Sequence, residues 1–158
     1  TIKFNPVKIE LVKQVSNVIS LVEIQAINKE INIYNNVYHN LFVNADENML
    51  DTILRNLLSN AIKFTKAKGE IHISSRIKDN FVIVSIKDNG VGMTEDCIKN
   101  LFNIENKNCS IGTANEQGSG LGLILCKDFI EKNGGKIWVE SNLDKGSEFI
   151  FSLPVYQE

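Results

Sequence analysis

Three polar side chains that suit a metal-phosphate site fall at helical spacing in one segment. Asn56, Asn60 and Lys63 are four and three residues apart, so on a helix they share one edge. Amide oxygens are neutral, hard ligands for a Mg²⁺ ion that already carries a triphosphate, and a lysine ammonium reaches phosphate oxygens. Two asparagines inside a helix cost stability, which favours a functional reason for them. Ordinary polar residues beside a core stripe are the competing interpretation, and this segment alone does not decide between the two.

A carboxylate in a glycine-containing turn forms the second group. The strand-like run 81–86 leads into Asp88, Asn89 and Gly90, which predict a turn, and Gly92 leaves no side chain to obstruct a ligand. A carboxylate here can accept a hydrogen bond from the exocyclic amine of adenine. Guanine presents a carbonyl at that position, so the group favours ATP over GTP. The alternative is a plain turn with a solvated aspartate.

A glycine-rich segment precedes the helix that we expect at 121–132. Gly118, Gly120 and Gly122 leave backbone N–H groups unshielded at a helix N-terminus, where anions bind. The segment lacks the Gly-Lys-Ser/Thr ending of a P-loop, and no parallel βαβ unit surrounds it as in a dinucleotide fold. Taken alone, it is better explained as a flexible hinge. The three groups in this order indicate a nucleotide pocket.

The rest of the sequence predicts the elements that position these groups. Asn5 and Pro6 predict the cap and first turn of a helix whose apolar stripe runs from Leu11 to Ala26. Asp46 or Asn48 is expected to cap the asparagine helix. The other expected elements are strands at 31–34 and 41–43, a hairpin of strands at 70–77 and 81–86 with Ile71, Ile73 and Ile77 facing a core, a short helix from Thr94 to Leu101, a long loop at 103–120, and strands at 136–141 and 147–153. We therefore expect one α+β domain over residues 1–158, with helices on one face of a mixed or antiparallel sheet.

Composition limits the classes of protein that this chain can represent. Of 158 residues, 43% are hydrophobic and 23% are charged, which predicts a folded domain. The net charge of −2 gives no electrostatic reason to bind nucleic acid or an anionic membrane, and no apolar run approaches the roughly 20 residues of a membrane span. Cys97, Cys109 and Cys126 show no close pairing. We expect three small, buried or half-buried side chains in a reducing compartment, without zinc.

The ordered motifs resemble the catalytic ATP-binding domain of two-component sensor histidine kinases, within the GHKL superfamily of gyrase, heat-shock chaperone and mismatch-repair ATPases. The resemblance covers nearly the whole chain. Its motifs are an N box at 56–65, a first glycine box at 88–92, an F box at Leu101 and Phe102, a second glycine box at 118–123, a last one at 144–147, and the run 134–141. The F box is thin, with one phenylalanine.

The resemblance implies a fold, cofactors and roles for individual residues. The fold would be a two-layer α/β sandwich with a mixed, mostly antiparallel sheet and helices on one face, and the cofactors would be ATP and Mg²⁺. Asn60 would ligate Mg²⁺, with Asn56 and Lys63 completing the catalytic set. The remaining ATP-binding residues would be Phe64, Asp88, Gly90 and Gly92 around adenine and Gly118, Gly120 and Gly122 around the triphosphate, together with Met93, Ser119, Leu121, Leu123 and Ser147. Residues 103–120 would form the ATP lid.

The resemblance also implies partners. The γ-phosphoryl group would pass to a histidine on a separate dimerisation domain of the same parent protein, then to an aspartate of a response regulator receiver domain. His39 and His72 lack the sequence context of that acceptor histidine. We expect a monomeric fragment, a homodimeric parent and no nucleic-acid partner. The fragment would be the cytoplasmic domain of a bacterial, membrane-anchored sensor.

Three other activities remain open on the sequence. An ATP hydrolase of the gyrase type would place a glutamate one turn before the metal-binding asparagine. Asn56 stands there and cannot act as a base, which predicts slow hydrolysis. A nucleotide-sensing docking module without transfer activity is the second alternative, and a serine kinase acting on a partner protein is the third.

Overall fold

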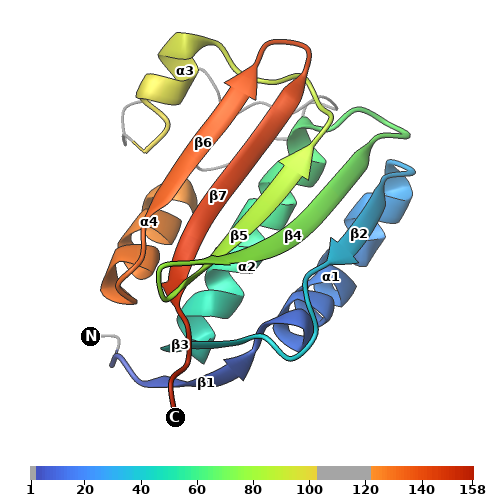
Figure 1. Cartoon of the computed structure of the whole chain (residues 1–158). Helices are drawn as coiled ribbons and strands as arrows, with labels where there is room; N and C mark the ends of the chain where they lie inside the picture. Colours follow the sequence, from blue (N-terminus) through green and yellow to red (C-terminus); the bar gives the residue numbers. More distant parts are fainter. Residues whose placement is uncertain (1–2, 103–121) are drawn as a thin grey trace.

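The computed structural model describes residues 3–102 and 122–158 as a sheet with helices on one of its faces (Figure 1). Within these residues the main sheet has five strands in the order β2-β4-β5-β7-β6. β2 (Asn32–Asn36) runs parallel to β4 (Glu70–Lys78). β4, β5 (Phe81–Asp88), β7 (Gly146–Pro154) and β6 (Ile137–Asn142) pair antiparallel in turn. The expected mixed, mostly antiparallel sheet is confirmed.

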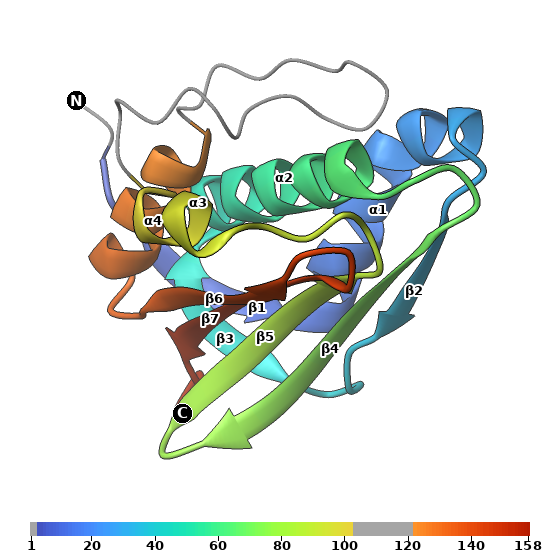
Figure 2. The same ribbon diagram turned by 90° about the horizontal axis from the view of Figure 1, so that it is seen from above.

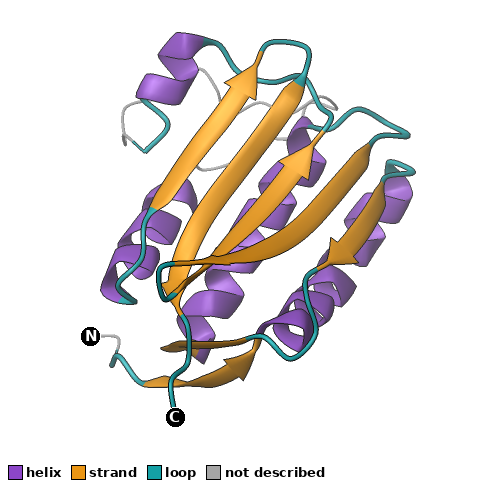
Figure 3. Ribbon diagram, viewed as in Figure 1, coloured by secondary structure: helices purple, strands orange, loops and turns teal. Residues whose placement is uncertain are grey.

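The helices α1 (Leu11–Asn28), α2 (Glu47–Phe64) and α4 (Gly122–Lys132) all cover the same face of this sheet (Figures 2 and 3). Thr94 caps the short α3 (Glu95–Lys99), as expected, and its hydroxyl accepts from Cys97 N. The core lies between the layers, where inward strand residues meet the apolar stripe of α2. Its fully buried side chains include Leu50, Ile53, Leu54, Leu57, Ile71, Ile73, Ile86 and Phe151. This packing fixes α2 across the middle of the sheet.

The N-terminal segment differs from the sequence prediction. Pro6 does not begin a helix, because Pro6–Glu10 forms β1, which pairs antiparallel with β3 (Phe42–Asp46). Proline is tolerated at the first residue of an edge strand, where its missing N–H is not needed. Asn5 N instead donates to Asp46 Oδ2 at 2.9 Å. The helix starts at Leu11, and its apolar stripe is buried as expected.

The hairpin of β4 and β5 is confirmed, but one of its core assignments is wrong. Ile71 and Ile73 are buried, whereas Ile77 is 60% exposed because β4 extends beyond the helices that cover its other end. Ser75 is buried in the same inward row, and its hydroxyl accepts from Tyr38 N at 3.1 Å.

Two of the cysteines fall within the described residues. Cys126 is fully buried with a free thiol, as expected. Cys97 is disulfide-bonded, so the expectation of a small unpaired side chain is wrong for it. Cys109 lies outside the described residues. No helix in the described part of the chain is long and apolar enough to cross a membrane.

Candidate nucleotide-binding site

The polar edge of α2 lies at the rim of the core. Asp46 begins the helix, because its Oδ1 accepts from Met49 N at 3.0 Å, which satisfies one of the free N–H groups of the first turn. Leu54, Leu57 and their neighbours on the apolar face are completely buried. Asn56, Asn60 and Lys63 are half-buried beside that face, so their polar ends reach the surface. The amphipathic pattern therefore holds three site candidates on one edge.

The C-terminal end of α2 is bonded directly to the loop that follows β5. Phe64 O accepts from Val91 N at 3.1 Å, and Lys63 Nζ lies 5.3 Å from the centre of the Phe64 ring. From the other side, Lys29 Nζ donates to Ile62 O at 2.9 Å and to Lys63 O at 3.2 Å. A lysine that binds the last carbonyls of a helix stabilises that end. The helix end and the loop are thereby held together.

Asp88 is the last residue of β5 and stands at the start of this loop, with its carboxylate oriented by backbone donors. It is only 4% exposed, and Oδ1 accepts from Gly90 N at 2.9 Å and from Ser147 N at 3.2 Å. Burial raises the pKa of the carboxyl above its ordinary value of 3.8, because lost solvation outweighs the two N–H bonds, which lower it. Both of these bonds use Oδ1, so Oδ2 is available to accept from a ligand amine.

The glycines of the loop are required by neighbouring backbone. A Cβ on Gly90 would stand 2.1 Å from Phe64 O, and one on Gly92 would stand 2.0 Å from Asn142 O. Gly92 also has a φ of 71°, a backbone angle that residues other than glycine adopt only with strain. The sequence predicts that Gly92 leaves space for a ligand. In the structure the space is taken by the turn between β6 and β7.

That turn closes the other side of the Asp88 loop through residues of the runs 134–141 and 144–147. Ser141 Oγ accepts from Met93 N at 2.9 Å and lies 2.8 Å from Ser147 Oγ. Asp144 N donates to Val91 O at 2.6 Å. Met93 and Ser147 are thus placed beside Asp88. Ser141 and Lys29 act across long sequence separations, so no local pattern predicts these contacts, although Ser141 lies in the run 134–141 that the resemblance marks.

The helix α4 borders the asparagine edge on the side opposite α1. Gly122 opens α4, and a Cβ on it would stand 3.1 Å from Asn56 Oδ1. Leu123 is half-buried against the core. Leu101 of the F box is buried, and Lys127 Nζ lies 5.7 Å from the centre of the Phe102 ring. The other expected members of the second glycine box and the expected lid lie outside the described residues: Gly118, Ser119, Gly120, Leu121 and 103–120.

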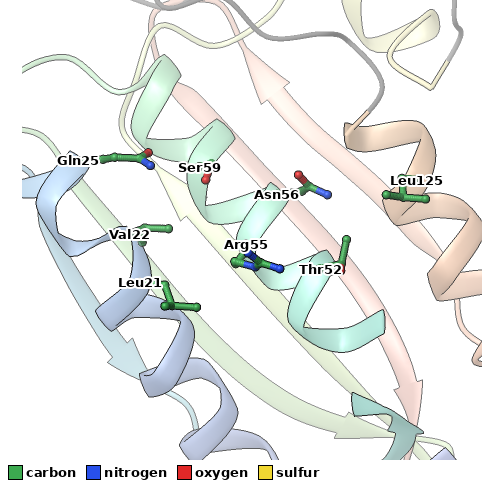
Figure 4. A pocket seen from close by; sticks show the side chains of 8 residues that line it. All are labelled: Leu21, Val22, Gln25, Thr52, Arg55, Asn56, Ser59 and Leu125. Atoms are coloured by element: carbon green, nitrogen blue, oxygen red, sulfur yellow. The ribbon is translucent and has the colours of Figure 1, made fainter. Parts of the chain in front are cut away.

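A groove of about 520 Å³ lies along the outer side of α2, between α1 and α4 (Figure 4). Its walls come from α1, through Leu21, Val22 and Gln25, and from α4, through Leu125. Its floor is α2, with Asn56 among the lining residues. Asn56 is therefore reachable from solvent along this groove. In the described part of the chain no cluster of three or more His, Cys, Asp or Glu side chains is placed to hold a metal.

A comparison with protein families decides the membership of the chain. Residues 45–157 match the family described as histidine kinase-, DNA gyrase B-, and HSP90-like ATPase. The chain belongs to this family. The match takes in α2, the Asp88 loop, α4 and the β6–β7 turn, which are the elements that meet at the candidate site.

Relatives place the chain among the histidine kinases of this family. The sensor protein SrrB of Staphylococcus aureus is 40% identical over 95 residues, which are 60% of this chain and 16% of that protein. The chain thus spans about a sixth of the length of this curated relative. The catalytic domain of histidine kinase ThkA, without nucleotide, superimposes with a TM-score of 0.81 at 31% identity, covering 97% of this chain and 96% of that one. The chain is a histidine-kinase catalytic domain with the ATP-binding fold of that family.

Full-length ShkA in complex with AMPPNP gives a TM-score of 0.83 at 28% identity, covering 99% of this chain and 32% of that one. ThkA in complex with the response regulator TrrA gives a TM-score of 0.77 at 28% identity, covering 97% of this chain and 42% of that one. Both are proteins in which a domain like this one is part of a longer chain. The resemblance to histidine-kinase catalytic domains and the expected fold are confirmed.

Proposed function

We propose that this domain binds Mg²⁺·ATP across α2 and the Asp88 loop and transfers the γ-phosphoryl group to a histidine supplied by another domain of its parent. The observation that carries the proposal is the hydrogen bond from Val91 N to Phe64 O. It joins the end of the asparagine helix to the loop that follows Asp88. A group suited to adenine and groups suited to phosphate therefore lie on two segments that are bonded directly to each other.

Adenine recognition is assigned to Asp88. Gly90 N and Ser147 N fix its Oδ1, which leaves Oδ2 to accept from the exocyclic amine of adenine. Phe64 is half-buried at the helix end, where an aromatic ring can pack on the base, and Gly90, Gly92 and Met93 shape the loop around it. Burial makes the carboxylate bond stronger than it would be in water.

Phosphate and metal binding are assigned to the edge of α2. The donor set fits Mg²⁺·ATP, because amide oxygens add no further negative charge to a cation that the triphosphate already surrounds. Asn60 would ligate the metal, while Asn56 and Lys63 would contact metal-bound water and phosphate oxygens. The bound metal would neutralise charge on the transferring phosphoryl group. The residues Gly118, Ser119, Gly120, Leu121, Gly122, Leu123 and Ser147 are proposed to complete the nucleotide site.

The acceptor histidine is assigned to a separate dimerisation domain. Neither histidine of this chain is presented by the candidate site. His72 lies on β4, stacks on Tyr34 and lies 3.0 Å from Glu70 Oε2, and His39 is exposed in the connection between β2 and β3. In the proposed step a ring nitrogen of the acceptor attacks the γ-phosphorus, and the bond to the departing ADP oxygen breaks. A response regulator would then receive the phosphoryl group, and a membrane-anchored, homodimeric sensor with this domain in the cytoplasm is the proposed setting.

Transfer is tested by mixing this chain with the dimerisation helices of its parent and γ-labelled ATP. The expected product is an acid-labile, base-stable phosphohistidine on those helices. Label that resists acid would indicate a serine kinase, and ATP binding without any transfer would indicate a sensing module. A hydrolysis rate matching that of dedicated ATPases would contradict the assignment of Asn56, which cannot act as a general base.

A further inference from the structure

The last turn of α2 carries one residue assigned to phosphate, Lys63, and one assigned to adenine, Phe64. An α-helix leaves its last four C=O groups without partners in its own regular turns. In α2 all four are bonded. Thr65 Oγ1 donates to Ala61 O at 2.6 Å, which satisfies the first of them. Val91 N donates to Phe64 O at 3.1 Å, which satisfies the last. The two carbonyls between these are bonded from α1.

Lys29, the residue that follows α1, supplies those bonds from a half-buried side chain. Its Nζ donates to Ile62 O at 2.9 Å and to Lys63 O at 3.2 Å. The backbone that carries it is fixed as well. Glu30 has a φ of 58°, and its N–H bonds back to Ile27 O at 2.9 Å, which closes α1 directly after Lys29. The end of one helix thus holds an ammonium group against the end of the other.

We propose that Lys29 is a positioning residue for the nucleotide site, which keeps the last turn of α2 closed so that Lys63 reaches phosphate and Phe64 reaches adenine. The proposal rests on the function proposed above. A cation suits this place because the carbonyl end of a helix is negative. Without the ammonium, the carbonyls of residues 62 and 63 would turn toward water and the last turn would open. The peptide between Lys63 and Phe64 would move, and the bond to Val91 N would weaken with it.

The test compares Lys29→Met with Lys29→Arg by calorimetry. Methionine keeps most of the length of the side chain but no donor, and Mg²⁺·ATP affinity should fall about 2- to 12-fold, the range for one net hydrogen bond. Adenosine affinity should fall as well, because Phe64 moves together with Lys63. Arginine keeps the charge and the donors, so it should recover most of both losses. A loss confined to Mg²⁺·ATP would mean that the charge acts on the phosphates alone, and would overturn the positioning role.

Two control variants separate positioning from a loss of charge or of stability. Lys13→Met removes the same charge from an exposed position of α1 and should leave both affinities unchanged. Asn133→Ala removes buried hydrogen bonds at the other end of α2, so it should lower the free energy of unfolding in urea without lowering affinity. Equal affinity losses in Lys29→Met and Asn133→Ala would show that Lys29 contributes stability only, and would overturn the proposal.

Hydrogen exchange of the Val91 amide tests the positioning without nucleotide. Because Val91 N donates to Phe64 O, its exchange should become faster in Lys29→Met and return toward the parent rate in Lys29→Arg. An unchanged rate in Lys29→Met would overturn the proposal. A parent chain that bound no Mg²⁺·ATP would instead overturn the proposed function, and the two failures are distinguished because the exchange rate is measured in the empty domain.

Discussion

Asp88→Asn should weaken ATP binding while stabilising the empty domain. The asparagine keeps a carbonyl oxygen in the place of Oδ1, so the bonds from Gly90 N and Ser147 N are retained. Only Oδ2 is replaced, by an NH₂ group that faces the adenine amine donor to donor. The lost bond to an ionised acceptor is worth about 1–3 kcal/mol, roughly a 5- to 150-fold loss of ATP affinity.

The stabilising effect follows from the raised pKa of Asp88. Because the folded-state value lies above the ordinary 3.8, the folded chain binds the proton more tightly than the unfolded chain. The resulting stability is fully present below pH 3.8 and is lost as the pH rises through the folded-state pKa. At pH 7 the parent chain carries a buried charge that the asparagine variant lacks. The variant should therefore have the larger free energy of unfolding at pH 7, with the difference shrinking toward pH 3.8.

Calorimetry with Mg²⁺·ATP and with adenosine, together with urea denaturation at both pH values, measures the two effects. ATP affinity of the parent chain should also fall as the pH approaches the raised pKa, and the variant should lack this dependence. Glu148→Gln is the matched control, because it makes the same chemical change next to Ser147 at a side chain that bonds Ser85 instead. Unchanged ATP affinity in Asp88→Asn would remove this residue from adenine recognition and refute the reasoning.

Three further predictions test the metal ligand, the loop packing and the helix junction. Asn60→Ala should weaken Mg²⁺-dependent ATP binding and spare metal-free binding, and equal losses by calorimetry would contradict the ligand role. Gly92→Ala should lower the free energy of unfolding in urea by more than Gly134→Ala, because both have positive φ but only Gly92 meets backbone, at 2.0 Å against 3.7 Å to a proline side chain at Gly134. Equal losses of unfolding free energy in the two variants would show that the cost comes from the positive φ alone and not from contact with Asn142 O. Asn133→Ala should lower the free energy of unfolding by about 1–3 kcal/mol. The buried Asn133 side chain accepts from Asp46 N at 2.8 Å and donates to Phe129 O at 2.7 Å, and both bonds would be lost. A loss below about 0.5 kcal/mol in the same assay would show that these bonds between α4 and the start of α2 contribute little.

Sequence determined the features of this protein that depend on neighbours along the chain. The spacing of Asn56, Asn60 and Lys63 put them on one edge because helical geometry is local, and the same geometry gave the Asp46 cap and the buried stripe of α2. The hairpin of β4 and β5 followed from two alternating runs joined by a short turn. The order of the motifs was enough to indicate the family.

Only the tertiary structure decided what depends on distant backbone. Pro6 belongs to a strand because β3, more than thirty residues later, offers it a partner. Gly92 is a glycine because Asn142 O lies against it, and Ser141 reaches Met93 across 48 residues. Asn56 lies in the same way against Gly122, the first residue of a helix that begins more than sixty positions further on. Such contacts form when layers pack, and packing follows the shape of the whole core, which no local pattern of residues records.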